Sequence, residues 1–253
     1  MGKVISFANQ KGGVGKTTSA VNVAAALGLK GHKTLLIDLD PQGNTTSGVG
    51  INKKELRYTS YDVIIGQCTS GEAVVKTDFK NLYVMPANIN LAAAEFEIIN
   101  MNNRVVKFKE PLDAIKKDYE YIIIDCPPSL GILTINALTA SDGVIIPMQC
   151  EYYALEGLSQ LMITLRQVKK LYNSDLEITG ILVTMYNGRL NLSMQVLDEL
   201  KKFYADKLFS TFVLRQVKLS EAPSYGKPII YYDKFSKGGQ AYMDIADEFI
   251  KRV

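Results

Sequence analysis

Cysteine and histidine are scarce in this chain of 253 residues, and neither is arranged as a metal site. The three cysteines, Cys68, Cys126 and Cys150, lie far apart, and no two of them form a C-x-x-C pair. Zinc sites and iron–sulfur clusters need several Cys or His ligands at short spacings, and disulfide frameworks need many cysteines in a small chain. The pattern therefore disfavours all three and is typical of a reducing cytoplasm. The lone histidine, His32, stands in a K-G-H-K segment, where we expect a solvated turn.

Long apolar runs are also missing. No stretch reaches the roughly 18 consecutive apolar residues that a membrane span requires, and no signal peptide is expected before the first apolar run. Residues 241–253 carry one apolar stripe at helical spacing, formed by Tyr242, Ile245, Ala246 and Phe249. The opposite face is acidic and an anionic membrane surface would repel it, so we expect a core-packed final helix and no membrane anchor.

A strong charge of either sign is absent as well. The formal net charge is +3, which is too small to indicate a nucleic-acid partner by itself. Between residues 186 and 240, however, nine basic residues face five acidic ones, which leaves +4 for this stretch and −1 for the remainder. A solvated surface is the simpler explanation of this clustering, and a binding face for an anionic partner stays open.

Hydrophobic residues make up 47% of the chain and recur as short β-branched runs separated by segments with helical spacing. The runs are apolar on both faces, as expected of strands in a parallel sheet that helices cover on both sides. The pattern predicts a doubly wound, mostly parallel α/β sheet in a single domain over residues 1–253, with ligands at the carboxyl ends of the strands. The predicted strands are 3–8, 34–38, 82–86, 121–125, 143–148 and 179–184, and the predicted helices include 17–30, 132–140, 155–171 and 192–204.

A glycine-rich segment, K-G-G-V-G-K-T-T at residues 11–18, follows the first predicted strand and opens the first helix. Glycines let successive backbone N–H groups point at bound phosphates, and the helix N-terminus adds partial positive charge. Lys16 is placed to reach the β- and γ-phosphates, and the Thr17 hydroxyl to ligate Mg²⁺. The sequence thus predicts a P-loop NTPase fold that binds ATP and Mg²⁺. The expected ATP-binding residues of the loop are Lys11, Gly12, Gly13, Val14, Gly15, Lys16, Thr17 and Thr18.

The loop departs from the general G-x-x-x-x-G-K-[ST] pattern, because Gln10 stands at the first glycine position and Lys11 precedes the glycine pair. Taken alone, Lys11 could be a solvated loop residue. The K-G-G-x-G-K-T-T segment, however, is similar to the deviant phosphate loop of the ParA/MinD ATPases. Further motifs across the chain resemble the ParA branch, in the short form that lacks an N-terminal helix-turn-helix domain. They are D-L-D-P-Q-G-N at 38–44, I-D-C-P-P-S-L-G at 124–131, C-E-Y-Y-A-L-E-G at 150–157 and L-S-E-A-P-S-Y-G-K-P at 219–228.

The resemblance implies a switch that dimerises when it binds ATP. In this family the lysine at position 11 reaches across a two-fold interface to the partner's ATP, and Gly12 lies where the subunits approach closely. A cation supplied in trans can stabilise the transferring phosphoryl group only after the dimer has formed. Lys11 and Asp40 are therefore the expected catalytic residues, with Asp40 orienting the attacking water.

Aspartates follow two predicted strands at the edge where the phosphate loop should lie. Asp125 ends one strand and is expected to hold Mg²⁺ through water. Asp38 ends the other and shares its strand face with Asp40, so all three carboxylates should meet at one edge of the sheet. The expected metal-binding residues are Thr17, Asp38 and Asp125.

The resemblance places two further binding functions in the C-terminal part of the chain. Leu214 and Gln216 stand where relatives contact adenine through a proline and an asparagine, so we expect them to contact the base. Relatives bind DNA without sequence preference through arginines at the positions of Arg189 and Lys218, and we expect Arg215 to join them. A lysine at 218 keeps the charge but loses the bidentate guanidinium.

The implied function is chromosome or plasmid partitioning by a cytoplasmic, nucleoid-associated ATPase. ATP closes the homodimer, the dimer binds double-stranded DNA, and a ParB-type partner triggers hydrolysis and release. The alternative is a MinD-like membrane-associated positioning ATPase, but the acidic final helix does not supply the basic amphipathic tail that it would need. A metabolic enzyme of the same fold would need a substrate pocket or paired cluster cysteines.

Overall fold

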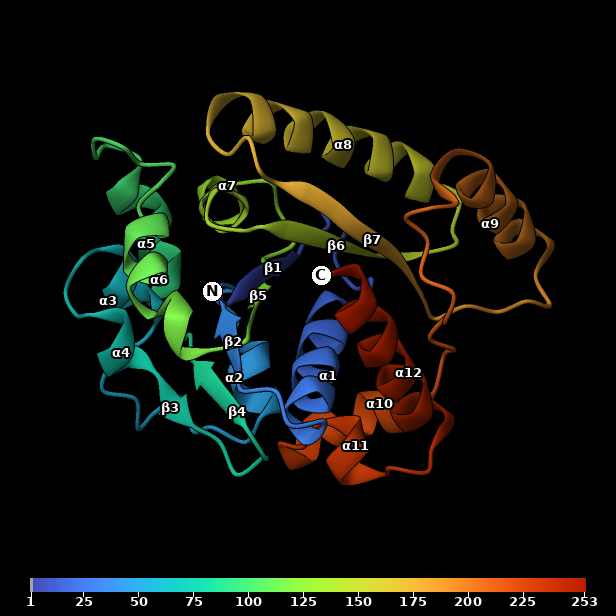
Figure 1. Ribbon diagram of the computed structural model, residues 1–253, viewed down its shortest axis with the longest axis horizontal. Coiled ribbons are helices and arrows are strands. Elements are labelled where there is room, and N and C mark those ends of the chain that lie inside the picture. The colour runs from blue at the N-terminus through green and yellow to red at the C-terminus, as the bar shows by residue number, and fades with distance from the viewer. Residues whose placement is uncertain (1) are drawn as a thin grey trace.

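The computed structural model describes residues 2–253, and within them seven strands form one sheet (Figure 1). The strands are β1 (Lys3–Phe7), β2 (Thr34–Asp38), β3 (Val75–Lys76), β4 (Leu82–Met85), β5 (Tyr121–Asp125), β6 (Gly143–Gln149) and β7 (Glu177–Thr184). They lie in the order β3-β4-β2-β5-β1-β6-β7, and neighbouring strands are parallel except β3 with β4. The predicted doubly wound, mostly parallel sheet is confirmed.

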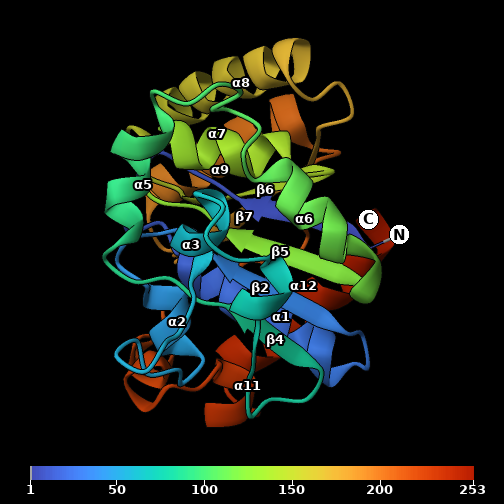
Figure 2. The ribbon, with the colours of Figure 1, turned by 90° about the vertical axis from the view of Figure 1, so that its left-hand side faces the viewer.

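Helices cover both faces of the sheet, as Figures 1 and 2 show. They are α1 (Lys16–Leu29), α2 (Asn44–Gly48), α3 (Ser60–Ile64), α4 (Ser70–Ala73), α5 (Leu91–Ile98), α6 (Lys109–Ile115), α7 (Ile132–Thr139), α8 (Ala154–Leu171), α9 (Asn191–Tyr204), α10 (Val217–Glu221), α11 (Ile229–Tyr232) and α12 (Lys237–Arg252), with 3₁₀ turns at Lys116–Asp118 and Ala222–Tyr225. Apolar residues of α1, α11 and α12 share one core cluster, whereas those of α5 to α9 share the other. The sheet therefore separates two hydrophobic layers.

The middle residues of the central strands β2 and β5 are apolar because each face of the sheet contacts one of these layers. In β2, Leu35 and Ile37 belong to the cluster that contains α5 to α9, whereas Leu36 belongs to the cluster that contains α1. All three side chains are fully buried. Burial of such a side chain contributes about 1.5–3 kcal/mol, so a polar substitution in β2 would be costly on either face.

The last helix is longer than the apolar stripe predicted. It begins at Lys237, because the Ser236 hydroxyl caps it by accepting the N–H of Gly239 at 3.0 Å. The stripe of Tyr242, Ile245, Ala246 and Phe249 is buried, and α12 packs against α1, as expected of a core-packed helix. Among residues 2–253, none of the helices combines the length and the hydrophobicity that crossing a bilayer requires.

Two local features differ from the sequence-based expectations. β3 is an additional two-residue strand that pairs antiparallel with β4, and it is too short to produce a recognisable hydrophobic pattern. His32 is not a freely solvated turn residue. Its Nδ1 lies 2.8 Å from a carboxylate oxygen of Glu120, and its ring packs edge-on against Tyr121.

The carboxyl ends of β1, β2 and β5 lie side by side at one edge of the sheet. In the register, Asp125 of β5 is the partner of Phe7 in β1 on one side and of Asp38 in β2 on the other. The segment that follows β1 therefore begins next to two carboxylates. This edge is where a parallel α/β sheet binds its ligands.

Candidate nucleotide-binding site

The glycine-rich loop connects β1 to α1, and two of its glycines have backbone angles that other residues rarely adopt. Gly13 has φ +74°, and Gly15, which precedes the first residue of α1, has φ +81°. A side chain there would cost about 1–2 kcal/mol of strain. Gly12 is different, because a Cβ at this position would meet only Pro128 Cβ at 3.8 Å, an ordinary contact. The fold of the subunit therefore requires Gly13 and Gly15 but leaves room for a side chain at Gly12.

The second half of the loop is fastened to the ends of β6 and β7. The Thr184 hydroxyl donates to the carbonyl of Val14 at 2.7 Å, and the Gln149 amide donates to the carbonyl of Gly13 at 3.1 Å. Lys16 folds back so that Nζ donates to the carbonyl of Lys11 at 2.9 Å. Lys16 is buried, and this burial lowers its pKa, although the Asp125 carboxylate opposes the effect. A desolvated ammonium enclosed by a loop of this shape is arranged for an anionic ligand.

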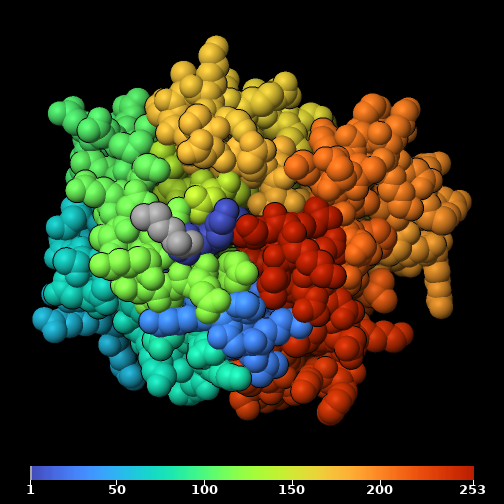
Figure 3. Space-filling model, in the orientation of Figure 1, coloured from blue at the N-terminus to red at the C-terminus, as the bar shows by residue number. Residues whose placement is uncertain are grey.

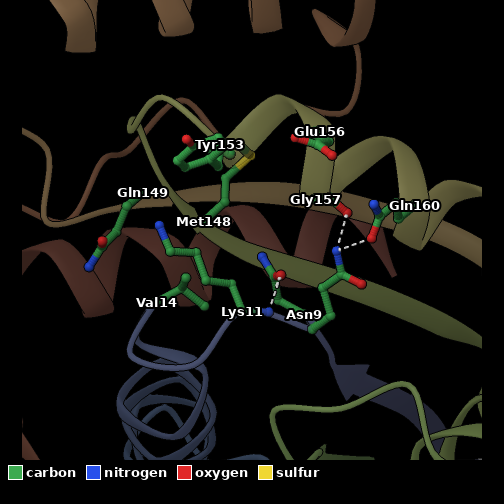
Figure 4. Close-up of a pocket in the computed structure, with 11 residues that line it drawn as sticks. Asn9, Lys11, Val14, Met148, Gln149, Tyr153, Glu156, Gly157 and Gln160 are labelled. Atoms are coloured by element: carbon green, nitrogen blue, oxygen red, sulfur yellow. Dashed lines mark hydrogen bonds between the residues drawn. The ribbon is translucent and has the colours of Figure 1, made fainter.

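Lys11 points to the other side of the loop. Figure 4 shows its side chain extending toward Gln149 and Tyr153, over a cleft of about 370 Å³ between the loop and the start of α8. There its ammonium group pairs with Glu151 of the same chain, and both side chains are substantially exposed. Lys11 and Lys16 thus occupy different environments, one at the rim of the site and one inside it.

The two strand-end aspartates are fully buried and close together. Asp38 accepts hydrogen bonds from the Thr46 N–H at 2.8 Å, from the Thr46 hydroxyl at 2.7 Å and from the Asp40 N–H at 3.2 Å. Asp125 accepts one from the Thr45 hydroxyl at 2.7 Å. Burial raises the pKa of Asp38 to about 6 and that of Asp125 to about 7, where the neighbouring Asp38 charge adds to the effect. A cation bound at this edge would favour the charged form of both carboxylates and so lower both pKa values.

Asp125 has a carboxylate oxygen that could still bind a metal ion, and this bears on whether the site can hold magnesium. Its second carboxylate oxygen, Oδ1, is buried without a hydrogen-bond partner. The Thr17 hydroxyl lies close enough to this carboxylate to lower its pKa. Within residues 2–253, no group of three or more His, Cys, Asp or Glu side chains is arranged to hold a metal by itself. Thr17 and Asp125 therefore fit Mg²⁺ that is held jointly with phosphate oxygens and waters, as is usual for this ion.

Asp40 closes the turn that leads from β2 to α2. It is nearly buried, its Oδ1 accepts the N–H of Gln42 at 2.9 Å, and its carbonyl accepts the N–H of Gly43 at 2.8 Å. Burial lowers the pKa of Lys16, and the Asp40 charge, like that of Asp125, opposes this effect. The structure therefore brings Asp40 to the phosphate loop.

Sequence reasoning missed Thr45 and Thr46. They follow D-L-D-P-Q-G-N directly and form the first turn of α2, which places one hydroxyl on each buried aspartate. Thr46 also accepts the N–H of Ala87 at 2.9 Å, which links this turn to the end of β4. In the sequence, the only indication was that two threonines stand next to each other after this motif. That they contact the aspartates depends on how α2 folds back on the sheet, which the sequence does not show.

A second cavity, of about 200 Å³, lies at the other end of the loop. Gly15 and Thr18 line one side of it, and Leu214 and Gln216 line the other. The Gln216 side-chain oxygen accepts the N–H of Gly238 at 3.0 Å, which leaves its NH₂ group to face a ligand. The structure thus brings the two predicted adenine residues together next to the phosphate loop.

The predicted DNA-binding residues are exposed and lie at two places. Arg189 is in the loop after β7, whereas Arg215 and Lys218 lie in and before α10. Lys218 pairs with Asp233. Arg215 also lines the 200 Å³ cavity, so this residue borders the expected base site as well as the surface.

Known proteins match the chain along its whole length. A family model described as an AAA domain matches residues 2–178. A protein of Bacillus subtilis (strain 168), the sporulation initiation inhibitor protein Soj, is 54% identical over 98% of both chains. The chromosome partitioning protein ParA of Myxococcus xanthus (strain DK1622) is 48% identical over 100% of this chain and 89% of its own. The structure of cobyrinic acid a,c-diamide synthase from Mycobacterium smegmatis with bound ADP and magnesium has a TM-score of 0.87 and 36% identity, and the similarity covers 99% of this chain and 95% of that chain.

Proposed function

Because this chain belongs to the ParA/MinD family of P-loop ATPases, we propose that it is a single-domain, ATP-dependent switch that forms a homodimer and acts in chromosome or plasmid partitioning. The observation that carries the proposal is the separation of its two loop lysines. The Lys16 ammonium lies inside the loop of its own subunit, where it bonds the carbonyl of Lys11. The Lys11 side chain instead extends away from the loop and pairs with Glu151. A lysine in that position is available to a second copy.

The nucleotide site uses residues of one subunit. Lys16 and the backbone N–H groups of residues 12–18 would hold the phosphates, and the cavity beside Leu214 and Gln216 would hold adenine. Thr17 and Asp125 would hold Mg²⁺, which supplies charge stabilisation at the phosphates when bound. Asp38 supports them indirectly, because its oxygens already bind Thr46 and the backbone of Asp40.

Hydrolysis needs a positioned water and a compensating cation. Asp40 is held in a turn at the edge of the site and would accept a hydrogen bond from the attacking water. Lys11 would exchange its partner Glu151 for the nucleotide bound to the second subunit. Because that cation arrives only with dimerisation, the reaction would be coupled to assembly.

Replacing Gly12 with valine should separate nucleotide binding from dimerisation. Gly12 has no close neighbour in its own subunit, so Gly12→Val should keep ATP affinity within about threefold and lose the ATP-dependent dimer. The measurements are nucleotide titration and light scattering. Gly13→Ala is the matched control, because its left-handed backbone predicts damage to the loop itself, by about 1–2 kcal/mol. An ATP dimer formed normally by Gly12→Val would place the interface elsewhere.

The dimer would bind double-stranded DNA through the basic C-terminal part of the chain. Much of this part forms the orange surface on the right-hand side of Figure 3. The side chains of Arg189, Arg215 and Lys218 are exposed. Contacts between these side chains and phosphates are weak and sensitive to salt for one subunit. Dimerisation doubles the number of contacts, so nucleotide state would control how long the protein stays on DNA.

Arg189→Glu should weaken retention on plasmid DNA while ATP-dependent dimerisation is unchanged. The substitution replaces a phosphate-binding cation by an anion on each subunit, and we expect at least a tenfold loss of affinity at low salt. Gel shift with ATP measures retention, and light scattering measures the dimer. If affinity at low salt were unaltered, the DNA-binding face would lie elsewhere.

A ParB-type protein is the proposed trigger of hydrolysis, and a cytoplasmic, nucleoid-associated location follows from the DNA partner. The deciding experiment is an ATPase assay with and without DNA and a cognate ParB peptide. Weak activity alone and clear stimulation by both would support partitioning. No stimulation by either, together with sedimentation on liposomes, would favour the MinD-like alternative. Retention of DNA only with ATP would also argue against a metabolic synthase, the role named for the 36% identical relative.

A further inference from the structure

Two strongly exposed phenylalanines lie in distant parts of the fold, one on α5 and one just before α12 (Figure 1). One has acidic neighbours in the chain and the other has basic neighbours. Phe96 on α5 is 77% exposed and lies between two glutamates. Phe235, just before α12, is 90% exposed and lies between Lys234 and the pair Ser236 and Lys237. A single exposed apolar residue is ordinary in itself. Phe235 is distinguished by how it is held and by what surrounds it.

Hydrogen bonds hold the turn that presents Phe235. The Asp233 carboxylate accepts the N–H groups of Phe235 at 3.2 Å and Ser236 at 3.1 Å, and the Ser236 hydroxyl donates to the carbonyl of Asp233 at 2.7 Å. The same hydroxyl caps α12. These bonds hold the backbone at the tip of the turn, so little backbone entropy is lost on binding, while the Phe235 ring is 90% exposed and not packed against the core.

Basic side chains surround this turn. The second carboxylate oxygen of Asp233 pairs with Lys218, and Gln216 accepts the N–H of Gly238, so α10 lies against the start of α12. The acidic groups of this surface already have partners, since Asp233 binds Lys218 and the Glu221 carboxylate accepts the Tyr232 hydroxyl at 3.3 Å. Lys234 and Lys237 flank Phe235 in the chain and are exposed, and Arg215 is exposed just before α10, while the charge of Lys218 is paired with that of Asp233.

We propose that Phe235 is a DNA-contacting wedge, whose ring inserts between bases from a groove while the surrounding cations bind the flanking phosphates. The inference rests on the proposed DNA binding and adds a non-electrostatic contact to it. Apolar wedges between base steps and stacking of aromatic rings on bases both tolerate any sequence, as non-specific binding requires. The other strongly exposed apolar residues of this part of the chain, Val217 in α10 and Tyr225 in the 3₁₀ turn, lie on different elements from Phe235, so they do not form the continuous apolar helix face that inserts into a lipid surface.

The salt dependence of DNA binding distinguishes the contribution of the Phe235 ring from that of the surrounding charges. Phe235→Ala should lower the affinity of the ATP-bound full-length protein for a duplex oligonucleotide about tenfold. The slope of log affinity against log salt should not change, because no charge is removed, whereas Arg189→Glu should reduce that slope. Phe235→Leu keeps an apolar wedge and should retain most of the affinity. A duplex containing 2-aminopurine should brighten with the wild type and not with Phe235→Ala.

Phe96→Ala is the matched control, because it removes another strongly exposed ring, one that lies between two glutamates, and should change neither affinity nor slope. Wild-type affinity in Phe235→Ala would overturn the wedge while leaving the proposed function intact. Failure of the wild type itself to bind DNA with ATP would overturn both. Lost binding of Phe235→Ala to vesicles of anionic phospholipid, with DNA affinity unchanged, would assign the ring to a membrane and overturn the inference.

Discussion

Replacing Lys16 with alanine should abolish measurable ATP binding. Lys16 is the buried cation of the loop, and its Nζ already points into the enclosure by bonding the carbonyl of Lys11. Charge-assisted hydrogen bonds to phosphates contribute about 1.5–3 kcal/mol each, so the loss of two of them weakens binding by at least a hundredfold. Titration with a fluorescent ATP analogue in the presence of Mg²⁺ measures the change.

The matched control is Lys11→Ala, which removes the other lysine of the same loop. Lys11 lies at the rim and pairs with Glu151, so its loss should leave binding to one subunit within about threefold. We expect it to remove ATP-dependent dimerisation and stimulated hydrolysis instead. The Lys16 ammonium donates one hydrogen bond, to the carbonyl of Lys11 within the same loop, so we expect Lys16→Ala to keep its fold, which thermal unfolding checks. Tight ATP binding by Lys16→Ala would remove the basis of the proposed function.

The fold and the centre of the site could be predicted because both follow from local pattern. Apolar runs buried on both faces predict parallel strands, and parallel strands place their carboxyl ends together. Asp38 and Asp125, 87 residues apart in the chain, are consequently neighbours in the sheet register. The phosphate loop could be predicted because its chemistry depends on one continuous segment.

Contacts that depend on loop conformation could not be predicted. Thr45 and Thr46 reach the buried aspartates only because α2 folds back after the turn at Gly43, whose φ is +62°. The pairing of Lys11 with Glu151 joins segments 140 residues apart, and no periodicity links them. The place of Arg215 beside the 200 Å³ cavity depends likewise on the irregular segment between α9 and α10.

Asp40→Ala should trap the ATP-bound dimer. The side chain is held at the edge of the site by the N–H of Gln42, and neither the loop glycines nor Lys16 depends on it for position. ATP binding and dimerisation should therefore persist, while hydrolysis falls by a factor of about 10²–10⁴, the usual contribution of a group that positions or activates the attacking water. Light scattering with ATP and a phosphate-release assay measure the two effects.

Asp38→Ala, two residues earlier, should behave differently and so serves as the control. Asp38 is fully buried and accepts three hydrogen bonds that fix Thr46 and the backbone of Asp40. Its removal leaves buried donors without partners, at a cost of about 1–3 kcal/mol each, so the unfolding temperature should fall. Asp40 is bound by fewer groups, and Asp40→Ala should unfold near the wild-type temperature. A stable Asp40→Ala protein that remains monomeric with ATP, or that hydrolyses ATP at the wild-type rate, would show that the water is positioned by another group.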